Sequence, residues 1–175
     1  THQEATGEYR SMKPWKRIEP TIISKIGWRT VVTKTFEMPD GRIHHFETVA
    51  KENSHAAGII AITRDMRVII ARQFRAAQEK ILDELPGGMV DEGEDFELAA
   101  RRELREETGY KPGKVLFLGS VYKDTYVNCT WHYFLATGCT ETAGQNLDES
   151  EHIEVTLISI EQLLENASSC KMTDT

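Results

Sequence analysis

The chain has 175 residues, 39% of them hydrophobic, and a formal net charge of −7 at neutral pH. This length and apolar fraction fit one domain with a substantial core. The acidic balance argues against a nucleic-acid polymer or an anionic membrane as partner, since either requires a basic surface. The sequence has no apolar run long enough to span a bilayer and no signal-like start, so we expect a cytoplasmic protein. Three cysteines without CxxC spacing indicate neither a disulfide framework nor a zinc site.

The chain begins with a polar segment, residues 1–14, which we expect to be flexible. Short runs rich in β-branched and apolar residues then predict strands, each bounded by turn-forming residues. The last element is a predicted helix over 161–167. The predicted strands cover 21–26, 29–37, 43–49, 57–63, 67–74, 81–84, 115–122, 131–137 and 153–158.

A second helix is predicted within the segment ELPGGMVDEGEDFELAARRELREETGY, residues 84–110. Asp95 is a good N-cap, strong helix formers follow it, and Gly109 is the residue type that commonly ends a helix. At about 100° per residue, the side chains from Phe96 through Ala100 and Leu104 to Thr108 form one stripe for the core. The other side of this helix carries most of its charge.

Glu103, Glu106 and Glu107 cluster on that other side. Like charges at these spacings repel each other by a few tenths of a kcal/mol per pair, and Arg102 and Arg105 offset them only in part. Clustered carboxylates suit a hard cation such as Mg²⁺ or Mn²⁺. The spacing alone leaves two interpretations open, a metal site and an ordinary solvated face.

The order of residues decides between these interpretations. Gly88, Glu94, the run Arg102-Glu103-Leu104, the pair Glu106-Glu107 and the pair Gly109-Tyr110 follow one another at spacings that resemble the Nudix box. This resemblance implies an α/β (α+β) Nudix fold, in which a mixed β-sheet is sandwiched between helices, here with an N-terminal antiparallel strand region. It also implies hydrolysis of nucleoside diphosphate compounds with a divalent cation.

Segments outside the box are similar to the ADP-ribose and nucleotide-sugar pyrophosphatases, namely 27–49, 71–75 continuing into 83–88, 128–134 and 148–155. The resemblance implies Mg²⁺-dependent cleavage of nucleoside diphosphate sugars to a nucleoside monophosphate and a sugar phosphate. ADP-ribose is the leading substrate, followed by ADP- and GDP-hexoses. Where those relatives carry a proline, this chain reads KDTYV at 123–127. A dinucleoside polyphosphate or nucleoside triphosphate hydrolase therefore stays open, as does a non-catalytic Nudix-fold nucleotide sensor, which would not need the acidic cluster.

The resemblance also implies roles for single residues. Glu103 and Glu107 are the expected metal ligands, with Glu106 serving a further ion and the carbonyl of Gly87 an additional ligand. Arg102 is expected to orient the carboxylates. Glu94 either braces the loop to the helix or has a purely structural role.

The expected general base is Glu151, although its acidic neighbours Glu149 and Glu154 stay open. In the binding site, Arg75 is expected at the diphosphate, Glu84 at the polar edge of the substrate, and Gly88 against the substrate.

Trp28 matches an adenine-stacking position that an N-terminal segment supplies across a dimer, unless it is a core residue. We therefore expect a homodimer, with a dimerising strand region over 15–55 and the Nudix domain over 56–170.

Overall fold

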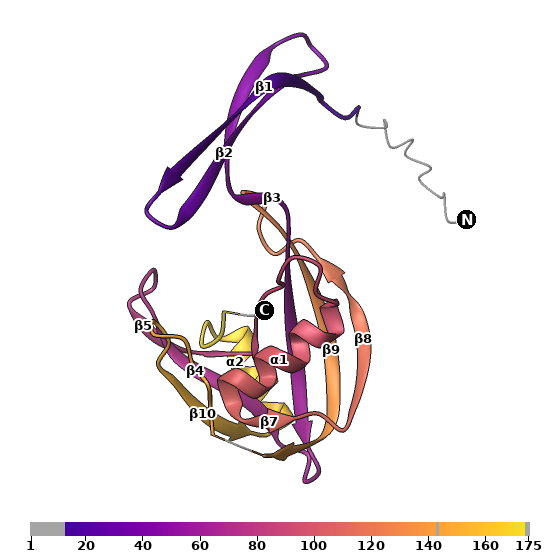
Figure 1. The fold of residues 1–175 in the computed structure, drawn as a ribbon, viewed down its shortest axis with the longest axis vertical. Helices are drawn as coiled ribbons and strands as arrows, with labels where there is room; N and C mark the ends of the chain where they lie inside the picture. The colour runs from indigo at the N-terminus through magenta and orange to yellow at the C-terminus, as the bar shows by residue number, and fades with distance from the viewer. Residues whose placement is uncertain (1–12, 143, 174–175) are drawn as a thin grey trace, which may run out of the picture. The chain divides into compact units, whose positions relative to one another are not determined.

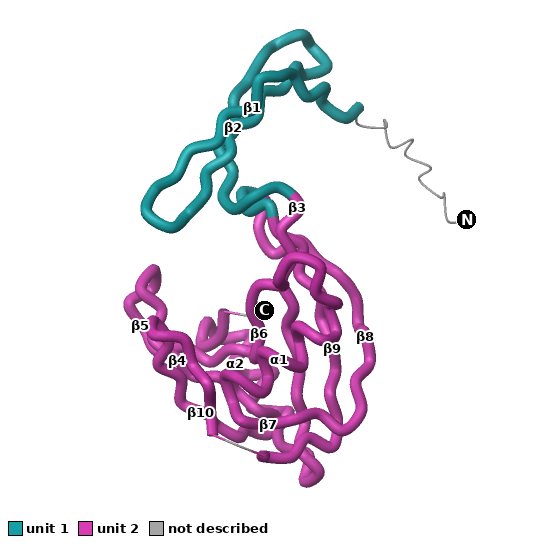
Figure 2. The backbone as a smooth tube through the Cα atoms, in the orientation of Figure 1, with its two compact units in different colours: residues 1–52, 126–128 teal, residues 53–125, 129–175 magenta. Residues whose placement is uncertain are grey.

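The computed structural model describes residues 13–142 and 144–173. The chain divides into two compact units (Figure 2): unit 1 runs up to Glu52 and includes Tyr126–Asn128, and unit 2 holds Asn53–Thr125 and the chain from Cys129 onward. The predicted flexible segment, 1–14, lies outside the described residues except for its last two.

Unit 1 is built from the hairpin of β1 (Lys16–Ile26) and β2 (Arg29–Glu37), and β2 pairs in turn with the first part of β3 (Ile43–Thr63). The prediction placed the start of β1 at residue 21, too late, because the pairing with β2 is interrupted by an irregularity between Ile18 and Ile22 that hides the strand periodicity. The predicted bounds of β2 are confirmed.

One long strand, β3, replaces two predicted strands, 43–49 and 57–63. The polar residues between them were not predicted to be strand, so the two separate predicted strands are wrong in that respect. Ala50 and Asn53 have positive φ angles of 70° and 59°, so the strand is locally distorted there but continues. The distortion lies where β3 passes from unit 1 into unit 2.

The sheet of unit 2 is formed around β3 and β4 (Val68–Arg75), which are antiparallel neighbours. β4 also pairs with β5 (Lys80–Glu84) and with β10 (Ile153–Ile158), and the bounds of β10 are as predicted. The remaining strands are β6 (Gly87–Met89), which pairs with β3; β9 (Val127–Glu141), which pairs with β3; and β7 (Tyr110–Lys111) and β8 (Lys114–Val121), which pair with β9. The short strands β6 and β7 were not predicted.

The two helices lie among the strands of unit 2 (Figure 1), and their separate buried clusters place them on opposite faces of the sheet. α1 (Phe96–Thr108) packs through Ala99, Ala100 and Leu104 on one buried cluster, whereas α2 (Ile160–Ser168) packs through Leu163 on another. Successive side chains of β4 point to opposite faces of the sheet, so Ile69 packs in the α1 cluster whereas Val68 and Ile70 pack in the α2 cluster. The predicted fold class is confirmed. Neither described helix is long and apolar enough to cross a membrane.

The caps of α1 are those that the sequence predicts. The Asp95 carboxylate accepts hydrogen bonds from the backbone N–H groups of Glu97, at 2.9 Å, and Leu98, at 3.2 Å. Gly109 ends the helix at φ 75°, and its N–H donates to the Arg105 carbonyl at 2.8 Å. The helix that carries the acidic cluster is therefore locally well defined.

Candidate active site

The acidic face of α1 meets the Pro-Gly-Gly strand β6. The Gly87 N–H donates to Oε2 of Glu107 at 2.9 Å. A side chain at Gly87 would bring a Cβ to 2.4 Å from the Ala57 carbonyl oxygen, and one at Gly88 would meet Oε1 of Glu103 at 2.6 Å. A Cβ at Gly87 would therefore clash with the backbone of β3, whereas a Cβ at Gly88 would displace the carboxylate of Glu103.

The direction of the Gly87 carbonyl follows from the ladder between β6 and β3. The Ile59 N–H donates to the Pro86 carbonyl at 2.9 Å, and the next pair in register is Gly58 with Gly87. Hydrogen-bonded and non-hydrogen-bonded pairs alternate in an antiparallel ladder, so both backbone groups of Gly87 point away from β3. The N–H reaches Glu107, which places the carbonyl oxygen on the same side as that carboxylate.

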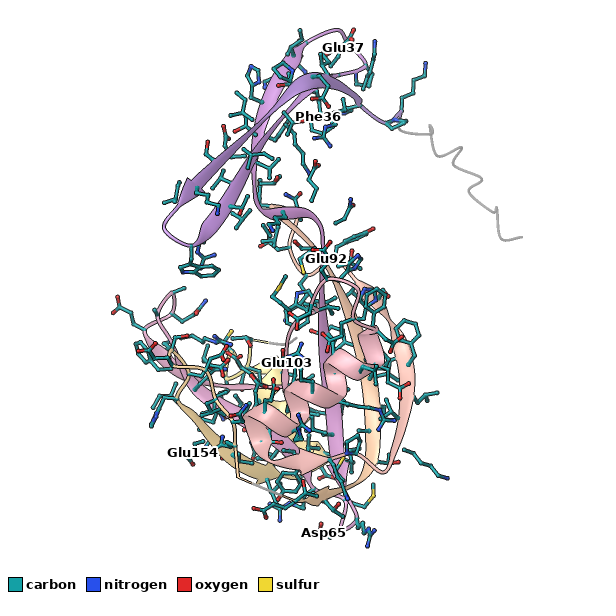
Figure 3. The ribbon with its side chains drawn as sticks, in the orientation of Figure 1. Phe36, Glu37, Asp65, Glu92, Glu103 and Glu154 are labelled. Atoms are coloured by element: carbon teal, nitrogen blue, oxygen red, sulfur yellow. The ribbon has the colours of Figure 1, made fainter. Side chains whose placement is uncertain are left out.

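The carboxylates of this cluster are unusually buried. Glu107 is only 5% exposed, and burial raises its pKa to about 8, with further contributions from Glu103, Glu151 and Glu84, while the hydrogen bond from Gly87 opposes the rise. Burial also raises the pKa of Glu103, whereas the hydrogen bond from Arg102 lowers it. Glu103 projects from α1 (Figure 3). Negative charge at this site is therefore costly without a cation.

Arg102 connects the cluster to the loop before the helix. Its guanidinium donates to both carboxylate oxygens of Glu94, at 2.9 and 3.0 Å, to Glu103 at 2.7 Å and to Glu106 at 3.2 Å. It also donates to the Met89 carbonyl at 3.0 Å, and Glu94 accepts from the Asp91 N–H at 3.0 Å. One arginine thus holds the loop, the helix and two cluster carboxylates together.

The donor set fits a hard divalent cation. Within 13–142 and 144–173, no three His, Cys, Asp or Glu side chains already converge in metal-binding geometry. Magnesium sites do not need such a cage, because one or two carboxylates suffice when water and substrate phosphates supply the other oxygens. Glu103 and Glu107, with the Gly87 carbonyl beside them, provide hard oxygen donors whose mutual repulsion a cation would relieve.

A second polar group lies on β4 and β5, on the α1 face of the sheet. Glu84, 6% exposed, accepts from Arg75 through Nε, at 2.5 Å, and through Nη2, and from Nε2 of Gln73 at 3.2 Å. Gln73 was missed in the sequence, although the period of two along β4 puts it on the same face as Arg75. The guanidinium of Arg75 is therefore held at two atoms by a buried carboxylate.

The three candidates for the general base, Glu149, Glu151 and Glu154, differ in their surroundings. Glu151 is half-buried and raises the pKa of both Glu103 and Glu107, so it lies within the field of the cluster. Its carboxylate accepts from the Asp148 N–H at 3.0 Å. Glu149 is exposed, and Glu154 (Figure 3) is exposed on β10 opposite Arg72. Of the three, Glu151 is electrostatically coupled to the acidic helix.

Trp28 lies in the turn of the hairpin and belongs to unit 1, whereas the other candidate residues belong to unit 2. Its side chain is 84% exposed, and the guanidinium of Arg29 stacks over its ring at 4.5 Å from the centroid. The alternative that Trp28 is a core residue is therefore wrong. An exposed indole face is available for a ligand or a partner surface.

A cavity of about 890 Å³ lies on the α2 face of the sheet, between that helix and β4, β5 and β10. Its walls include Arg72, Asp83 and Asn166. Asp83 is buried, pairs with Arg72 at 2.7 Å and accepts from Asn166 at 2.8 Å. Arg72, Asp83 and Asn166 therefore form a structural network. This network is separate from the acidic cluster, which lies on the α1 face of the sheet.

Comparison with known proteins decides the family. Residues 52–172 match the NUDIX domain. The chain belongs to the Nudix family. The ADP-ribose pyrophosphatase of Bacillus subtilis (strain 168) is 31% identical over 140 residues, which cover 79% of this chain and 75% of that protein. The ADP-sugar pyrophosphatase of Mus musculus is 31% identical over 151 residues, which cover 79% and 69%.

A solved structure described as an ADP compounds hydrolase has the same fold, with a TM-score of 0.79 over 94% of this chain and 89% of that one, at 20% identity. The Nudix fold predicted from the box is thereby confirmed. Nudix hydrolases generally use divalent metal ions, and in this Nudix chain the box runs from β6 through the following loop and α1 to the start of β7.

Proposed function

We propose that this Nudix hydrolase cleaves the pyrophosphate bond of nucleoside diphosphate sugars with Mg²⁺, ADP-ribose first and ADP- or GDP-hexoses next. The products are a nucleoside monophosphate and a sugar phosphate. The observation that carries the proposal is the pair of buried carboxylates, Glu103 and Glu107, beside the backbone of Gly87. The relatives named ADP-ribose and ADP-sugar pyrophosphatase support the substrate class.

Glu103, Glu107 and the Gly87 carbonyl are the proposed ligands of Mg²⁺, which Mn²⁺ can replace, and Glu106 serves a further ion. When bound, the cation neutralises phosphate oxygens and lowers the pKa of the attacking water. Arg102 keeps Glu103 and Glu106 in place through its hydrogen bonds at 2.7 and 3.2 Å. Its own charge also reduces the repulsion between them.

Glu151 is the proposed general base, which takes the proton of the attacking water. Its influence on the pKa values of Glu103 and Glu107 supports this assignment. Glu149 and Glu154 have side chains open to solvent.

Arg75 is proposed to bind the diphosphate, because a planar guanidinium matches phosphate oxygens. Glu84 fixes the direction of that guanidinium by accepting from its Nε and Nη2. At Gly88 the missing side chain lets the substrate approach Glu103 closely. In this proposal Arg75 and Glu84 bind the substrate, whereas the carboxylates of α1 and Glu151 carry out the hydrolysis.

Trp28 is proposed to stack on the base of the nucleotide in a homodimer. Its 84% exposure supports this role, as do the exposed side chains of Ile22, Ile23 and Ile26 on the same hairpin. Exposed apolar groups of this size are typical of an interface. We assign dimerisation to the strand region over 15–55 and catalysis to 56–170.

A turnover assay across a nucleotide panel tests the function. The purified chain with Mg²⁺ is given ADP-ribose, ADP-glucose, GDP-mannose, a diadenosine polyphosphate and nucleoside triphosphates, and the products are separated by chromatography. We expect AMP and ribose phosphate from ADP-ribose, and no product after chelation of the metal. Turnover restricted to diadenosine polyphosphates or triphosphates would replace the proposed substrate class. Binding without turnover would identify a nucleotide sensor.

A further inference from the structure

The described residues between β9 and β10, 142 and 144–152, are attached to the C-terminal end of the box helix. Thr142 donates to the Gly109 carbonyl through its N–H, at 3.0 Å, and through its hydroxyl, at 3.2 Å. The Asn146 N–H donates to the Glu106 carbonyl at 2.8 Å. The last four carbonyls of a helix lack partners within it, so this segment satisfies groups that the helix itself cannot.

Gln145 makes the connection that reaches furthest. Its Nε2 donates to the Glu107 carbonyl at 2.6 Å and to the Ile153 carbonyl, at the start of β10, at 3.0 Å. One side-chain amide carries two N–H donors, and both are used here. Two carbonyl oxygens at the same nitrogen fix the orientation of the amide, since its own oxygen would be repelled there. The side chain therefore closes residues 146–152 into a loop, because Gln145 at one end binds the carbonyl of Ile153 at the other end and also the carbonyl of Glu107.

Glu151 lies in this closed loop, two positions before Ile153. The residues whose carbonyls hold the loop, Glu106 and Glu107, are also those whose carboxylates form the acidic cluster. We propose that Gln145 is a positioning residue that fixes the carboxylate of Glu151 relative to the metal-binding carboxylates of α1. The inference rests on the proposed function, in which Glu151 is the base.

Positioning of this kind has a large kinetic effect, because a displacement of about 1 Å in a reacting group can cost roughly a hundredfold in rate. Without the amide of Gln145, the loop would keep the backbone hydrogen bonds of Thr142 and Asn146 but lose its attachment to β10. The part of the loop next to β10, which carries Glu151, would therefore be less firmly held.

The first test compares Gln145→Ala and Gln145→Glu with a matched control. Glutamate keeps the size of the side chain but, when ionised, has no N–H to donate. Gln162→Ala is the control, since Nε2 of Gln162 also donates to two oxygens, those of Glu165 at 3.3 Å and Asn166 at 2.9 Å, but on α2. We expect kcat to fall about tenfold to a hundredfold in both Gln145 variants, with KM nearly unchanged. The control should keep wild-type kcat. A rise in KM without loss of kcat would overturn the inference.

A double-mutant cycle separates positioning from a general structural role. In a Glu151→Gln background, Gln145→Ala should add less than about a threefold loss, because the group that it positions no longer acts as a base. The full loss in both backgrounds would show that Gln145 acts through something other than Glu151, and the inference would be wrong.

Hydrogen exchange provides a readout that does not depend on turnover. In Gln145→Ala, amides of 146–152 should exchange faster than in the wild type, and those of α2 should not change. If the wild type hydrolyses nothing in the panel, the proposed function fails, and exchange alone decides whether Gln145 holds the loop. Unchanged exchange at 146–152 would overturn the inference even in an active enzyme.

Discussion

The box helix and the N-terminal hairpin depart from the usual distribution of side chains in opposite directions. On α1, Glu107 is only 5% exposed, although ionisable carboxylates are seldom buried. On the hairpin of β1 and β2, Trp28 is 84% exposed and Ile23 is 69% exposed, although large apolar groups favour the interior. One region buries charge and the other exposes apolar surface.

Burying a carboxylate and exposing large apolar side chains are both unfavourable in free energy, and binding of a suitable partner would offset each. A buried carboxylate needs an opposite charge, which a divalent cation supplies. Exposed tryptophan and isoleucine side chains need an apolar surface, which a nucleobase or a second copy of the hairpin supplies. The acidic cluster and the exposed hairpin would thus be stabilised by partners of two different kinds, and the following predictions separate them.

The largest effect is expected for removal of charge from α1. Glu103→Gln and Glu107→Gln should each lower kcat about a thousandfold or more, because the ligand charge is lost. The melting temperature should stay the same or rise, since repulsion among the carboxylates decreases. Glu97→Gln is the control, as Glu97 pairs with Arg101 at 2.7 Å on the same helix away from the cluster. Near-wild-type turnover of a cluster variant at saturating Mg²⁺ would refute the metal assignment.

The next effect concerns the base. Glu151→Gln should lower kcat about a hundredfold to ten-thousandfold, with substrate and metal affinity nearly intact. Steady-state kinetics and metal titration measure the two quantities separately. Glu149→Gln and Glu154→Gln are the matched comparisons, and a larger loss in either would transfer the role to that residue.

A smaller effect is expected on the exposed hairpin. Trp28→Ala should raise KM for ADP-ribose about tenfold to a hundredfold, because a stacked base is worth about 1–3 kcal/mol, and kcat should change less. The melting temperature should hardly move, since the indole is 84% exposed. An unchanged KM would remove Trp28 from the binding site.

A deletion in the same hairpin tests the proposed homodimer. Deletion of 1–28 removes β1, and with it the exposed Ile22, Ile23 and Ile26. If this segment is exchanged between subunits, sedimentation should show a dimer for the full chain and a monomer for the truncated one. A truncated protein that remains dimeric would place the interface elsewhere.

The smallest effect is a pH dependence of stability in metal-free protein. The pKa of Glu107 is raised from 4.5 to about 8 in the folded state. The folded state therefore binds this proton more tightly than the unfolded state, so the stabilisation is complete below the unfolded pKa and is lost as pH rises through the folded one. The melting temperature should fall by several degrees between about pH 5 and pH 8.5. Glu107→Gln should flatten this profile, and Mg²⁺ at high pH should restore stability; a flat wild-type profile would contradict the buried charge.

Local signals in the sequence determine the box helix almost completely. Asp95 and Gly109 mark its ends, and the spacing of Glu103, Glu106 and Glu107 places all three carboxylates on one side, because residues three and four apart are neighbours on any α-helix. The bounds of β2 and β10 are equally local, since turn residues or a helix cap adjoin them. The box spacing also identified the family, because it lies within one continuous segment.

The tertiary structure alone decided which of these groups are buried and what holds them. Four features depend on residues that are distant in the chain. They are the continuity of β3, the burial of Glu107, the hydrogen bond from Gln73 to Glu84 and the hydrogen bonds of the Gln145 amide. Gln145 lies 38 residues from Glu107, one of the two residues whose carbonyls it binds, and its own neighbours in the sequence carry no pattern that indicates a role. Periodicity and capping report on contacts within a few residues, whereas burial and long-range hydrogen bonds form only when separate strands and helices pack together.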